Sequence, residues 1–583
     1  MEICNKNIFK VLIALFSSFI LAKQFNLHHY TFVYLFFSLL LILFFIKANT
    51  DLTRRKKKYV FILSFASALI FSIGTIVWEN EFQGVYDIFT LRRIVLLILF
   101  FVADFSIAYY SFSAILNKLE TFNLYENPGK FYILSGKSAF LISFFIIFLA
   151  YLPYLIRSYP AIMSPDSFVQ INSVENHVLS NLHPFVQTWL FGGIYNIGKL
   201  VFGKGNAAIA FYIIFQMFVT SAVFALYITF LYKKHINKYV ILATLAFYAF
   251  SPLHAFYSVT LWKDILFGVN FLAMNLIYIK LNQSGFNFKT ICLFTVTNLA
   301  MIFLRNNGIY ILILVTPVLI YFYKNSRKII ALTCICIITF YYIFTGPIYN
   351  AIGVSKTKSI EAFSIPLQQI ARVIALDKKI DNESLNYLNE ILDLESVKNN
   401  YAPHISDPVK NSVYIEKFDE TKVKFLFVWA KLFFEHPQVY IEAYFSQTLG
   451  YWYPDTIYYA IGGLNAETEL YNAYKYGISN TNNLPNYINK LFDMLADKSL
   501  PFSYIIWSTG LYCYLLFISI AFAIYNRKFI GKNIICYLPL IMLWLTMMVA
   551  SPVFAELRYI YGIFTCLPLA LILPYTKEKE SNE

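Results

Sequence analysis

The chain is patterned as long apolar stretches separated by short polar segments. About fourteen stretches approach the ~20 residues that an α-helix needs to cross the roughly 30 Å hydrocarbon core of a membrane. We therefore predict an all-α integral membrane protein. The predicted helices cover residues 8–22, 29–47, 59–78, 94–112, 138–157, 206–232, 239–257, 263–281, 290–304, 308–323, 329–346, 503–525, 534–550 and 556–574.

Basic clusters between the stretches give the predicted orientation, because Lys and Arg are enriched in cytoplasmic loops. With the N-terminus inside, every cluster is cytoplasmic provided that the moderately apolar stretch Phe185–Phe202 does not cross. We predict that this stretch lies at the outer surface as an amphipathic helix. Arg92 and Arg93 are the exception, since they fall at the outer edge of the fourth helix. The clusters are residues 54–58, 233–234, 324–328, 527–528 and 577–579.

A long polar stretch interrupts the pattern near residues 347–500. It contains 14 Lys or Arg and 18 Asp or Glu. This slight negative balance, in a chain that is otherwise basic, favours an extracytoplasmic and mostly helical domain. We predict four parts. They are N-terminal transmembrane helices (1–134), a transmembrane core (135–346) with a first outer loop (158–205), the extracytoplasmic domain (347–500), and C-terminal transmembrane helices with a cytoplasmic tail (501–583).

Composition agrees with a membrane protein and excludes several other classes. Hydrophobic residues make up 58% of the 583 residues and charged residues only 14%, too few to cover water-soluble domains of this total size. The net charge of +14 comes from short clusters rather than one basic face, which argues against nucleic-acid binding. The seven cysteines lie in or beside apolar stretches and have neither zinc-type nor disulfide-type spacing.

Polar residues at the ends of the apolar stretches gather on the predicted outer side. A charged group near hydrocarbon is costly, so such groups usually pair or serve a function. Their convergence on one layer is stronger evidence than any one of them. The segments are Ser164–Ser167, His183-Pro184, Trp262–Asp264, Arg305–Asn307 and Glu556–Arg558.

Asp166 has two interpretations. It follows Pro165 at a helix start, where its carboxylate could simply cap the helix. It could instead act as a general base that takes a proton from an acceptor hydroxyl. Both remain open from the sequence.

The other outer-face groups also have two interpretations each. His183 could bind phosphate or tune a carboxylate, or could be an interfacial side chain. Lys263 and Asp264 could be a plain ion pair at a helix start, or could neutralise a phosphate and orient it or hold a metal. Arg305 and Arg558 could clamp a phosphate through their forked geometry, or could reach towards lipid headgroups.

Taken in order, these motifs resemble GT-C-type polytopic membrane glycosyltransferases, and among them the bacterial DUF6020-like group. The resemblance covers about residues 135–575. It is carried by Ser164-Pro165-Asp166-Ser167 with Gln170, His183-Pro184, Trp262-Lys263-Asp264, Leu304-Arg305-Asn306, residues 365–372 and residues 404–410.

The resemblance implies a multi-pass glycosyltransferase of the bacterial plasma membrane that uses a polyprenyl-phosphate sugar donor. Its acceptor would be a cell-wall polymer or glycolipid at the outer face. The catalytic acid of the first outer loop maps to Asp166, and many families of the fold carry two adjacent acids there, whereas this chain has one. A divalent metal is therefore possible but not indicated, and no other cofactor is expected. Substrate-binding residues would be Gln170, His183, Lys263, Asp264, Arg305, Gln369, Arg372 and Arg558.

The main alternative is a transporter or flippase for a lipid-linked glycan. A transporter is expected to carry charged or helix-breaking residues near the middle of its spans. Here the charges cluster at helix ends, with Asp104 the main exception. A non-catalytic membrane scaffold is a third possibility, because nothing in the sequence shows what the polar domain binds.

Overall fold

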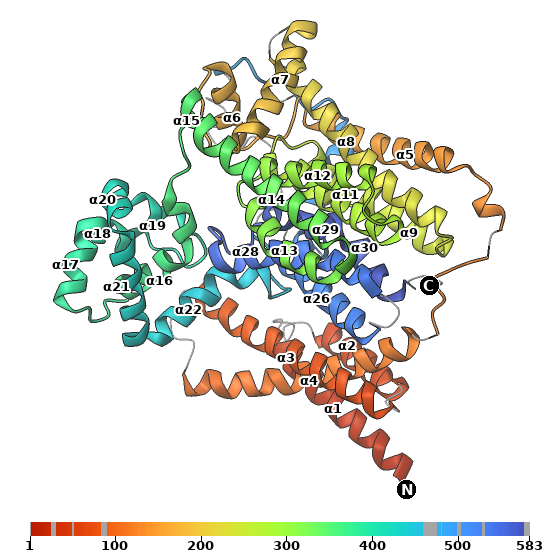
Figure 1. Ribbon diagram of the computed structural model, residues 1–583. Coiled ribbons are helices and arrows are strands. Elements are labelled where there is room, and N and C mark those ends of the chain that lie inside the picture. Colours follow the sequence, from red (N-terminus) through yellow and green to blue (C-terminus); the bar gives the residue numbers. More distant parts are fainter. Residues whose placement is uncertain are drawn as a thin grey trace. The chain divides into compact units, whose positions relative to one another are not determined.

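The computed structural model describes residues 2–24, 31–48, 52–82, 90–119, 121–127, 129–203, 205–458, 475–479, 481–497, 503–526 and 531–576. Within these ranges the fold is all-helical, with isolated bridges and no strands (Figure 1). Every predicted apolar stretch is helical where it is described. The basic clusters 527–528 and 577–579, and residues 459–474 of the predicted polar domain, lie outside the described residues.

In the part of the chain that the structure describes, eight helices are long and apolar enough to cross a membrane, judged by length and composition. Two bent helix pairs and four shorter apolar helices match the remaining predicted stretches. The chain therefore carries the helices of a multi-pass membrane protein, while fourteen crossings remain a prediction. The eight are Asn7–Gln24, Arg54–Glu79, Leu91–Lys118, Gly136–Arg157, Asn206–Lys233, Lys263–Ser284, Lys324–Ile352 and Gly531–Ala550.

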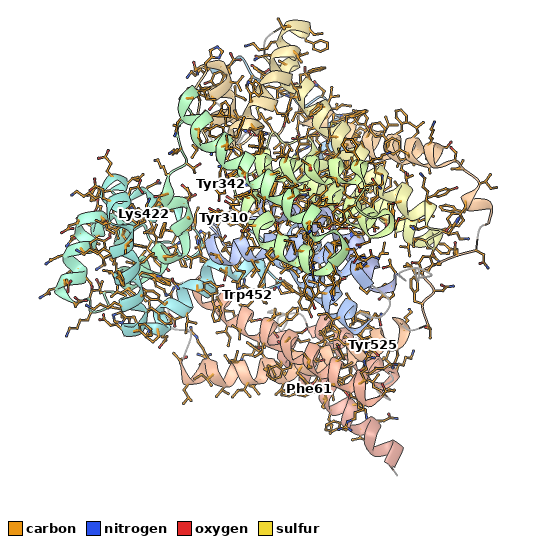
Figure 2. All side chains as sticks on the ribbon, in the orientation of Figure 1. Phe61, Tyr310, Tyr342, Lys422, Trp452 and Tyr525 are labelled. Carbon is orange, nitrogen blue, oxygen red and sulfur yellow. The ribbon has the colours of Figure 1, made fainter. Side chains whose placement is uncertain are left out.

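Two compact units divide the chain, and the first joins segments far apart in sequence: residues 1–123, 363–456 and 551–554. Its apolar helices are α1 (Glu2–Gln24), α2 (Thr31–Lys47), α3 (Arg54–Phe82) and α4 (Leu91–Leu119). Its shorter helices, which include the group marked by Lys422 in Figure 2, are α16 (Ser364–Ala375), α17 (Asn382–Ile391), α18 (Leu394–Asn400), α19 (Asp407–Asn411), α20 (Ile415–Glu420), α21 (Lys422–Glu435), α22 (Pro437–Thr448) and η6 (Leu449–Tyr451).

The short helices of this unit are joined to α3 by a close aromatic contact. Gly74 of α3 lies directly under Tyr453, so a Cβ at position 74 would come within 2.2 Å of the Tyr453 ring. Helix α22 also packs against α3. The polar segment 363–456 therefore belongs with the N-terminal helices, although more than 200 residues separate α4 from α16.

The second unit holds residues 124–362, 457–550 and 555–583. Its N-terminal half comprises η2 (Lys130–Tyr132), α5 (Gly136–Arg157), α6 (Pro165–Glu175), α7 (Phe185–Phe202), α8 (Asn206–Lys233), α9 (Lys238–Phe250), α10 (Pro252–Ser258) and α11 (Lys263–Ser284). There follow α12 (Phe288–Leu304), α13 (Gly308–Phe322), η3 (Lys324–Ser326), α14 (Arg327–Ile343), η4 (Phe344–Ile348), α15 (Tyr349–Ile352) and η5 (Ser359–Phe363), which reaches the first unit.

The C-terminal part of the second unit consists of shorter elements. They are α24 (Asn486–Ala496), α25 (Ser503–Trp507), α26 (Thr509–Tyr525), η7 (Gly531–Tyr537), α28 (Leu538–Ala550), η8 (Leu557–Ile560), α29 (Tyr561–Thr565), α30 (Leu567–Ile572) and η9 (Leu573–Tyr575). Helix α7, predicted to lie at the surface, is a helix but is not one of the eight candidate spans. On α13 and α14, Tyr310 and Tyr342 are exposed (Figure 2).

Helix α11 is the most buried of the eight candidate spans and packs against α8, α12 and α29. Two glycines set its contact with α29. A Cβ at Gly268 would lie 2.5 Å from the Tyr561 ring, and a Cβ at Gly562 would lie 2.6 Å from the Phe271 ring. Each glycine thus makes room for an aromatic ring of the other helix, which holds α29 and the preceding η8 close to α11.

Candidate functional site

The loop before α6 is fixed to the segment before α11 by backbone hydrogen bonds. Leu261 N donates to Ile162 O at 2.9 Å, and Ile162 N donates to Val259 O at 2.9 Å. The Ser167 hydroxyl adds a bond of 2.7 Å to Leu261 O. This pairing brings the first turn of α6 next to the first turn of α11.

The first turn of α6 shows that Asp166 is not the residue that caps the helix. Ser164 is the N-cap residue, and the Ser167 hydroxyl accepts a hydrogen bond of 3.0 Å from Ser164 N. This reciprocal arrangement is a capping box, so the cap is provided by serines. Asp166 lies one residue after Pro165 inside the helix, and its carboxylate points to other partners.

Five charged side chains, two acidic and three basic, meet at the start of α11, and together they form the candidate site. Asp166 Oδ2 lies 2.7 Å from Arg558 Nη1 and 3.4 Å from Lys263 Nζ. Asp264 Oδ1 lies 3.2 Å from Arg305 Nη1, and Asp264 Oδ2 lies 3.9 Å from Lys263 Nζ. Lys263 therefore links two carboxylates, each of which has its own arginine.

Aromatic rings hold both guanidinium groups. Arg558 lies over the Trp262 ring at 4.9 Å, and Arg305 lies over the Tyr559 ring at 4.6 Å. Trp262 in turn donates from Nε1 to the Ser164 hydroxyl at 2.5 Å. Such stacking fixes the planar fork of an arginine and is favourable where water is excluded. The arginines are therefore held in place rather than reaching freely towards lipid headgroups.

Burial differs sharply between the two carboxylates. The Asp264 side chain is fully buried, whereas a third of the Asp166 side chain (34%) remains exposed. The side chains of Lys263 and Arg558 are each 15% exposed. Asp166 is thus the acid of the cluster that an external molecule can reach.

Electrostatics keep Asp166 ionised and His183 neutral. Burial alone would raise the pKa of the Asp166 carboxyl, but the charges of Lys263 and Arg558 outweigh it and hold that pKa well below its usual range. Burial, aided by the positive charge of Lys263, lowers the pKa of His183 to about 4. At neutral pH His183 is therefore an uncharged hydrogen-bonding group beside an anion.

Several buried polar atoms of the site have no hydrogen-bond partner. They include both carboxylate oxygens of Asp264, His183 Nδ1 and Arg558 Nε. Asp264 therefore meets Arg305 as a close ion pair without hydrogen-bond geometry. Buried polar atoms are usually satisfied, and those left over in a charged cluster commonly serve a ligand. The unused Nε donor of Arg558 suits an anionic oxygen.

A comparison with protein families identifies the chain at this point. The DUF6020 family, described as a family of unknown function, matches residues 172–583. The chain belongs to the DUF6020 family. No curated protein and no solved structure matches it.

The DUF6020 match includes most of the charged cluster but not all of it. His183, Lys263, Asp264, Arg305 and Arg558 lie inside the matched range. Asp166 lies six residues before the match begins at position 172. The carboxylate on which the predicted chemistry depends is thus placed by the structure of this chain and not by its family assignment.

Gln170 lies on the buried side of α6 away from the cations. Its Nε2 donates to the Gln187 side chain and, at 3.3 Å, to the Thr188 hydroxyl. These bonds join α6 to the first turn of α7. The structure thus gives Gln170 a positioning role between two helices of the DUF6020 chain; its predicted contact with substrate remains a prediction.

Gln369 and Arg372 belong to the first unit and are occupied there. Arg372 Nη2 lies 3.0 Å from Glu442 Oε2, and both side chains are almost fully buried. Gln369 accepts a bond of 2.8 Å from Trp429 Nε1 and donates to Tyr440 O at 3.2 Å. Both residues therefore have partners within the first unit, and their predicted contact with substrate remains a prediction.

Three further residues shape the site and were not predicted to act in it. Glu556 is buried 3.8 Å from Arg558, and Trp262 and Tyr559 stack on the arginines. Trp262 precedes Lys263, and Glu556 lies two residues before Arg558, so closeness in the sequence to a predicted site residue was the available signal. Tyr559 had none, because a tyrosine next to a charged residue is ordinary in a chain with 46 tyrosines.

In the described part of the chain, no group of three or more His, Cys, Asp or Glu side chains is arranged to hold a metal ion. Within the site, Asp166, Asp264 and Glu556 each lie within 4 Å of a Lys or Arg. A divalent cation would have to displace these partners. The site is therefore better suited to an anion.

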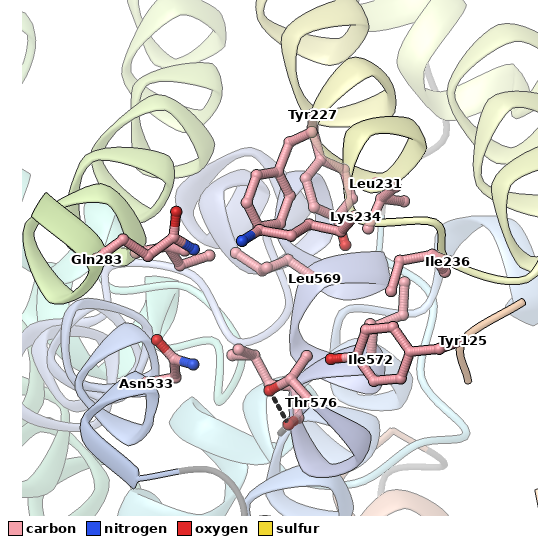
Figure 3. A pocket seen from close by; sticks show the side chains of 13 residues that line it. Tyr125, Tyr227, Leu231, Lys234, Ile236, Gln283, Asn533, Leu569, Ile572 and Thr576 are labelled. Carbon is pink, nitrogen blue, oxygen red and sulfur yellow. Dashed lines mark hydrogen bonds between the residues drawn. The ribbon is translucent and has the colours of Figure 1, made fainter. Parts of the chain in front are cut away.

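A separate pocket lies at the opposite end of α8 and α11 (Figure 3). Lys234, Gln283 and Asn533 supply its polar groups on one side, and Tyr125 and Thr576 line the other. Lys263 and Gln283 are separated by 20 residues of helix, or about 30 Å at 1.5 Å per residue. The pocket thus shares no residue with the charged cluster.

Proposed function

We propose that this DUF6020 chain is a membrane glycosyltransferase that moves a sugar from a polyprenyl-phosphate donor to a cell-envelope polymer or glycolipid at the outer face of the bacterial plasma membrane. One observation carries the proposal. Asp166, a partly exposed carboxylate on α6, lies between Lys263 and Arg558. Lys263 is the first residue of α11, a candidate membrane-spanning helix.

The cations provide a place for the phosphate of the donor. Lys263, Arg305 and Arg558 converge from α11, the end of α12 and η8, and the arginines present forked donors that match phosphate oxygens. When the bond to the sugar breaks, the electron pair stays on the phosphate oxygen. Preorganised cations stabilise that developing charge better than water does.

Asp166 supplies the base. The acceptor hydroxyl oxygen attacks the anomeric carbon, the bond from that carbon to the phosphate oxygen breaks, and the hydroxyl proton passes to Asp166. An ion-paired carboxylate is a weak base, so Asp166 must first be released from its cations. A bound phosphate competes for Arg558 and Lys263, which makes Asp166 more basic when donor is present.

The location of the site supports an enzyme over a transporter. Substrate sites of transporters lie near the middle of the membrane, often at broken helices. Here Lys263 and Asp264 form the first turn of α11, and Arg305 follows the last residue of α12. A lipid-linked donor whose phosphate lies at the headgroup level would meet the charges at that depth.

A reaction with a labelled donor tests the proposal. Purified chain in vesicles that contain polyprenyl-phosphate carrying a radiolabelled sugar, together with cell-envelope extract as acceptor, should transfer label to acceptor and release polyprenyl phosphate in equal amounts. Transfer with no movement of donor between leaflets supports the enzyme. Movement of intact donor across the bilayer without transfer would instead establish the flippase.

A further inference from the structure

An acidic residue lies in the middle of α4, away from the site around Asp166. Asp104 is the fourteenth residue of the 29-residue helix Leu91–Leu119, and its relative exposure is 8%. On the eight candidate spans, the other described acidic residues lie within about one turn of a helix end. Asp104 is thus the carboxyl group that the described helices place deepest in an apolar span.

Polar side chains from three other segments of the first unit meet near Asp104. The Gln24 carboxamide of α1 interacts with the Asp104 carboxyl and donates from Nε2 to the Thr75 hydroxyl of α3 at 2.7 Å. The Tyr453 hydroxyl lies 3.1 Å from that of Thr75. A small polar cluster is therefore built between α1, α3, α4 and the segment after η6.

Among the described residues, no Lys or Arg pairs with Asp104. The nearby basic side chains, Lys23 and Arg93, interact with Glu79 of α3. The charged groups that interact with Tyr453 are Asp104, Glu79 and Asp455, which are all acidic. Within the described residues, the Gln24 carboxamide is the hydrogen-bonding group at the Asp104 carboxyl.

Two acceptor atoms of the cluster are reached by no donor from the described residues. Asp104 Oδ2 and Gln24 Oε1 are both buried without a partner. An unpaired carboxylate in an apolar helix bundle costs several kcal/mol, and such a group avoids the cost by becoming neutral. A proton on Asp104 removes the charge and adds the donor that two acceptors lack.

We propose that Asp104 is a proton-binding site within the membrane helices of the first unit, occupied at neutral pH. Its ligand is a proton rather than Na⁺. A sodium ion needs about six oxygen ligands of its own, by analogy with other hard cations. Here the Thr75 hydroxyl already donates to Phe71 O and accepts from Gln24. The Gln24–Thr75–Tyr453 chain provides groups through which this proton can exchange.

Carbodiimide modification tests this inference. Dicyclohexylcarbodiimide is an apolar reagent that adds to protonated carboxylic acids, so the full chain in vesicles should be modified at pH 7 on the peptide that contains Asp104. Modification should fall as the pH is raised. Asp104→Asn should lose it, while Glu79→Gln, which removes a neighbouring acid, should retain it.

Thermal unfolding gives a second readout that does not depend on the reagent. If the folded chain holds a proton that the unfolded chain releases, stability must fall as the pH rises. The unfolding midpoint should therefore drop between pH 7 and pH 9 by more in the natural chain than in Asp104→Asn. The inference would be overturned if Asp104 were not modified at pH 7. It would also be overturned if about 100 mM NaCl, but not KCl, protected Asp104 from modification at constant pH. Equal pH dependence of the unfolding midpoint in the natural chain and in Asp104→Asn would overturn it as well.

Discussion

Arg558 Nη1 donates to Asp166 Oδ2 at 2.7 Å, across 392 residues of sequence. The bond connects the first turn of α6 with η8. Lys263, on the third helix α11, forms a second ion pair with Asp166. A carboxylate with two cationic partners stays ionised over the whole physiological range. Its protonation therefore depends on what happens to the partners when a ligand arrives, and this can be tested residue by residue.

Asp166→Asn should abolish sugar transfer while expression and membrane insertion are retained. Asparagine keeps the size and the hydrogen bonding but cannot accept the proton, so a rate loss on the order of 10²-fold or more is expected. Transfer from a labelled polyprenyl-phosphate donor, in membranes with equal amounts of protein, measures the loss. Glu175→Gln is the matched control, because Glu175 belongs to the same helix but pairs with Lys199. Near-normal transfer by the Asn variant would move suspicion to Asp264.

Arg558→Lys should impair donor use although the charge is kept. A lysine cannot keep both the bond to Asp166 and the stacking on Trp262, and it lacks the fork that matches phosphate. We expect kcat/KM for the donor to fall by about tenfold or more. Arg157→Lys is the control, since Arg157 pairs with the largely exposed Asp493. Equal losses in both variants would contradict a specific role for Arg558.

The sequence predicted which residues would gather in this site better than it predicted what they do. Charged residues at the ends of apolar stretches had to lie in one layer if the stretches were helices, and this brought Asp166, Lys263, Asp264, Arg305 and Arg558 together. The individual partners could not be predicted. They depend on the backbone pairing of Ile162 with Val259 and Leu261 and on the close packing of α29 against α11, neither of which has a periodic signal.

The polar domain shows what residue spacing can and cannot predict. Its helical content could be predicted from spacing, but its grouping with the N-terminal helices could not, because Tyr453 packs on Gly74 across 379 positions. Gln369 and Arg372 were assigned to substrate on resemblance alone. The apolar helix around them gave no sign that Arg372 would pair with Glu442 or that Gln369 would accept a hydrogen bond from Trp429.

Arg372→Met should destabilise the first unit, because it leaves Glu442 buried without its cation. The expected cost is ~3–5 kcal/mol, the usual size when one partner of a buried pair is removed. Arg372→Met combined with Glu442→Leu should recover much of the loss. Thermal unfolding of the purified chain in detergent measures both. A direct substrate role would be indicated if Arg372→Met kept its stability and lost transfer.

His183 should stay neutral through the range in which a free histidine titrates. Its pKa of about 4 in the folded chain lies below the ~6.5 of an unfolded histidine, so the unfolded state binds the proton first as the pH falls. The contribution of His183 to stability is thus complete above about pH 6.5 and is lost towards pH 4. The unfolding midpoint should fall more between pH 7 and pH 5 in the natural chain than in His183→Gln. An equal fall would show that the imidazole titrates normally.

Cysteine labelling tests the predicted orientation. Trp189→Cys on α7 and Asn400→Cys in α18 replace exposed residues, and both should react with an impermeant maleimide in intact cells. Lys234→Cys, at the far end of α8, should react only after permeabilisation. Protection of position 400 in intact cells would overturn the extracytoplasmic location of the polar domain.

The packing of Tyr561 on Gly268 and of Phe271 on Gly562 should make the charged cluster sensitive to the surrounding lipid. Arg558 reaches Asp166 only while η8 and α29 stay tight against α11, and Lys263 and Arg305 are carried by the ends of apolar helices. Apolar helices adjust their tilt to the thickness of the bilayer. A thinner or thicker membrane would therefore shift Lys263 and Arg558 relative to Asp166, so acyl-chain length should change the rate of the proposed sugar transfer.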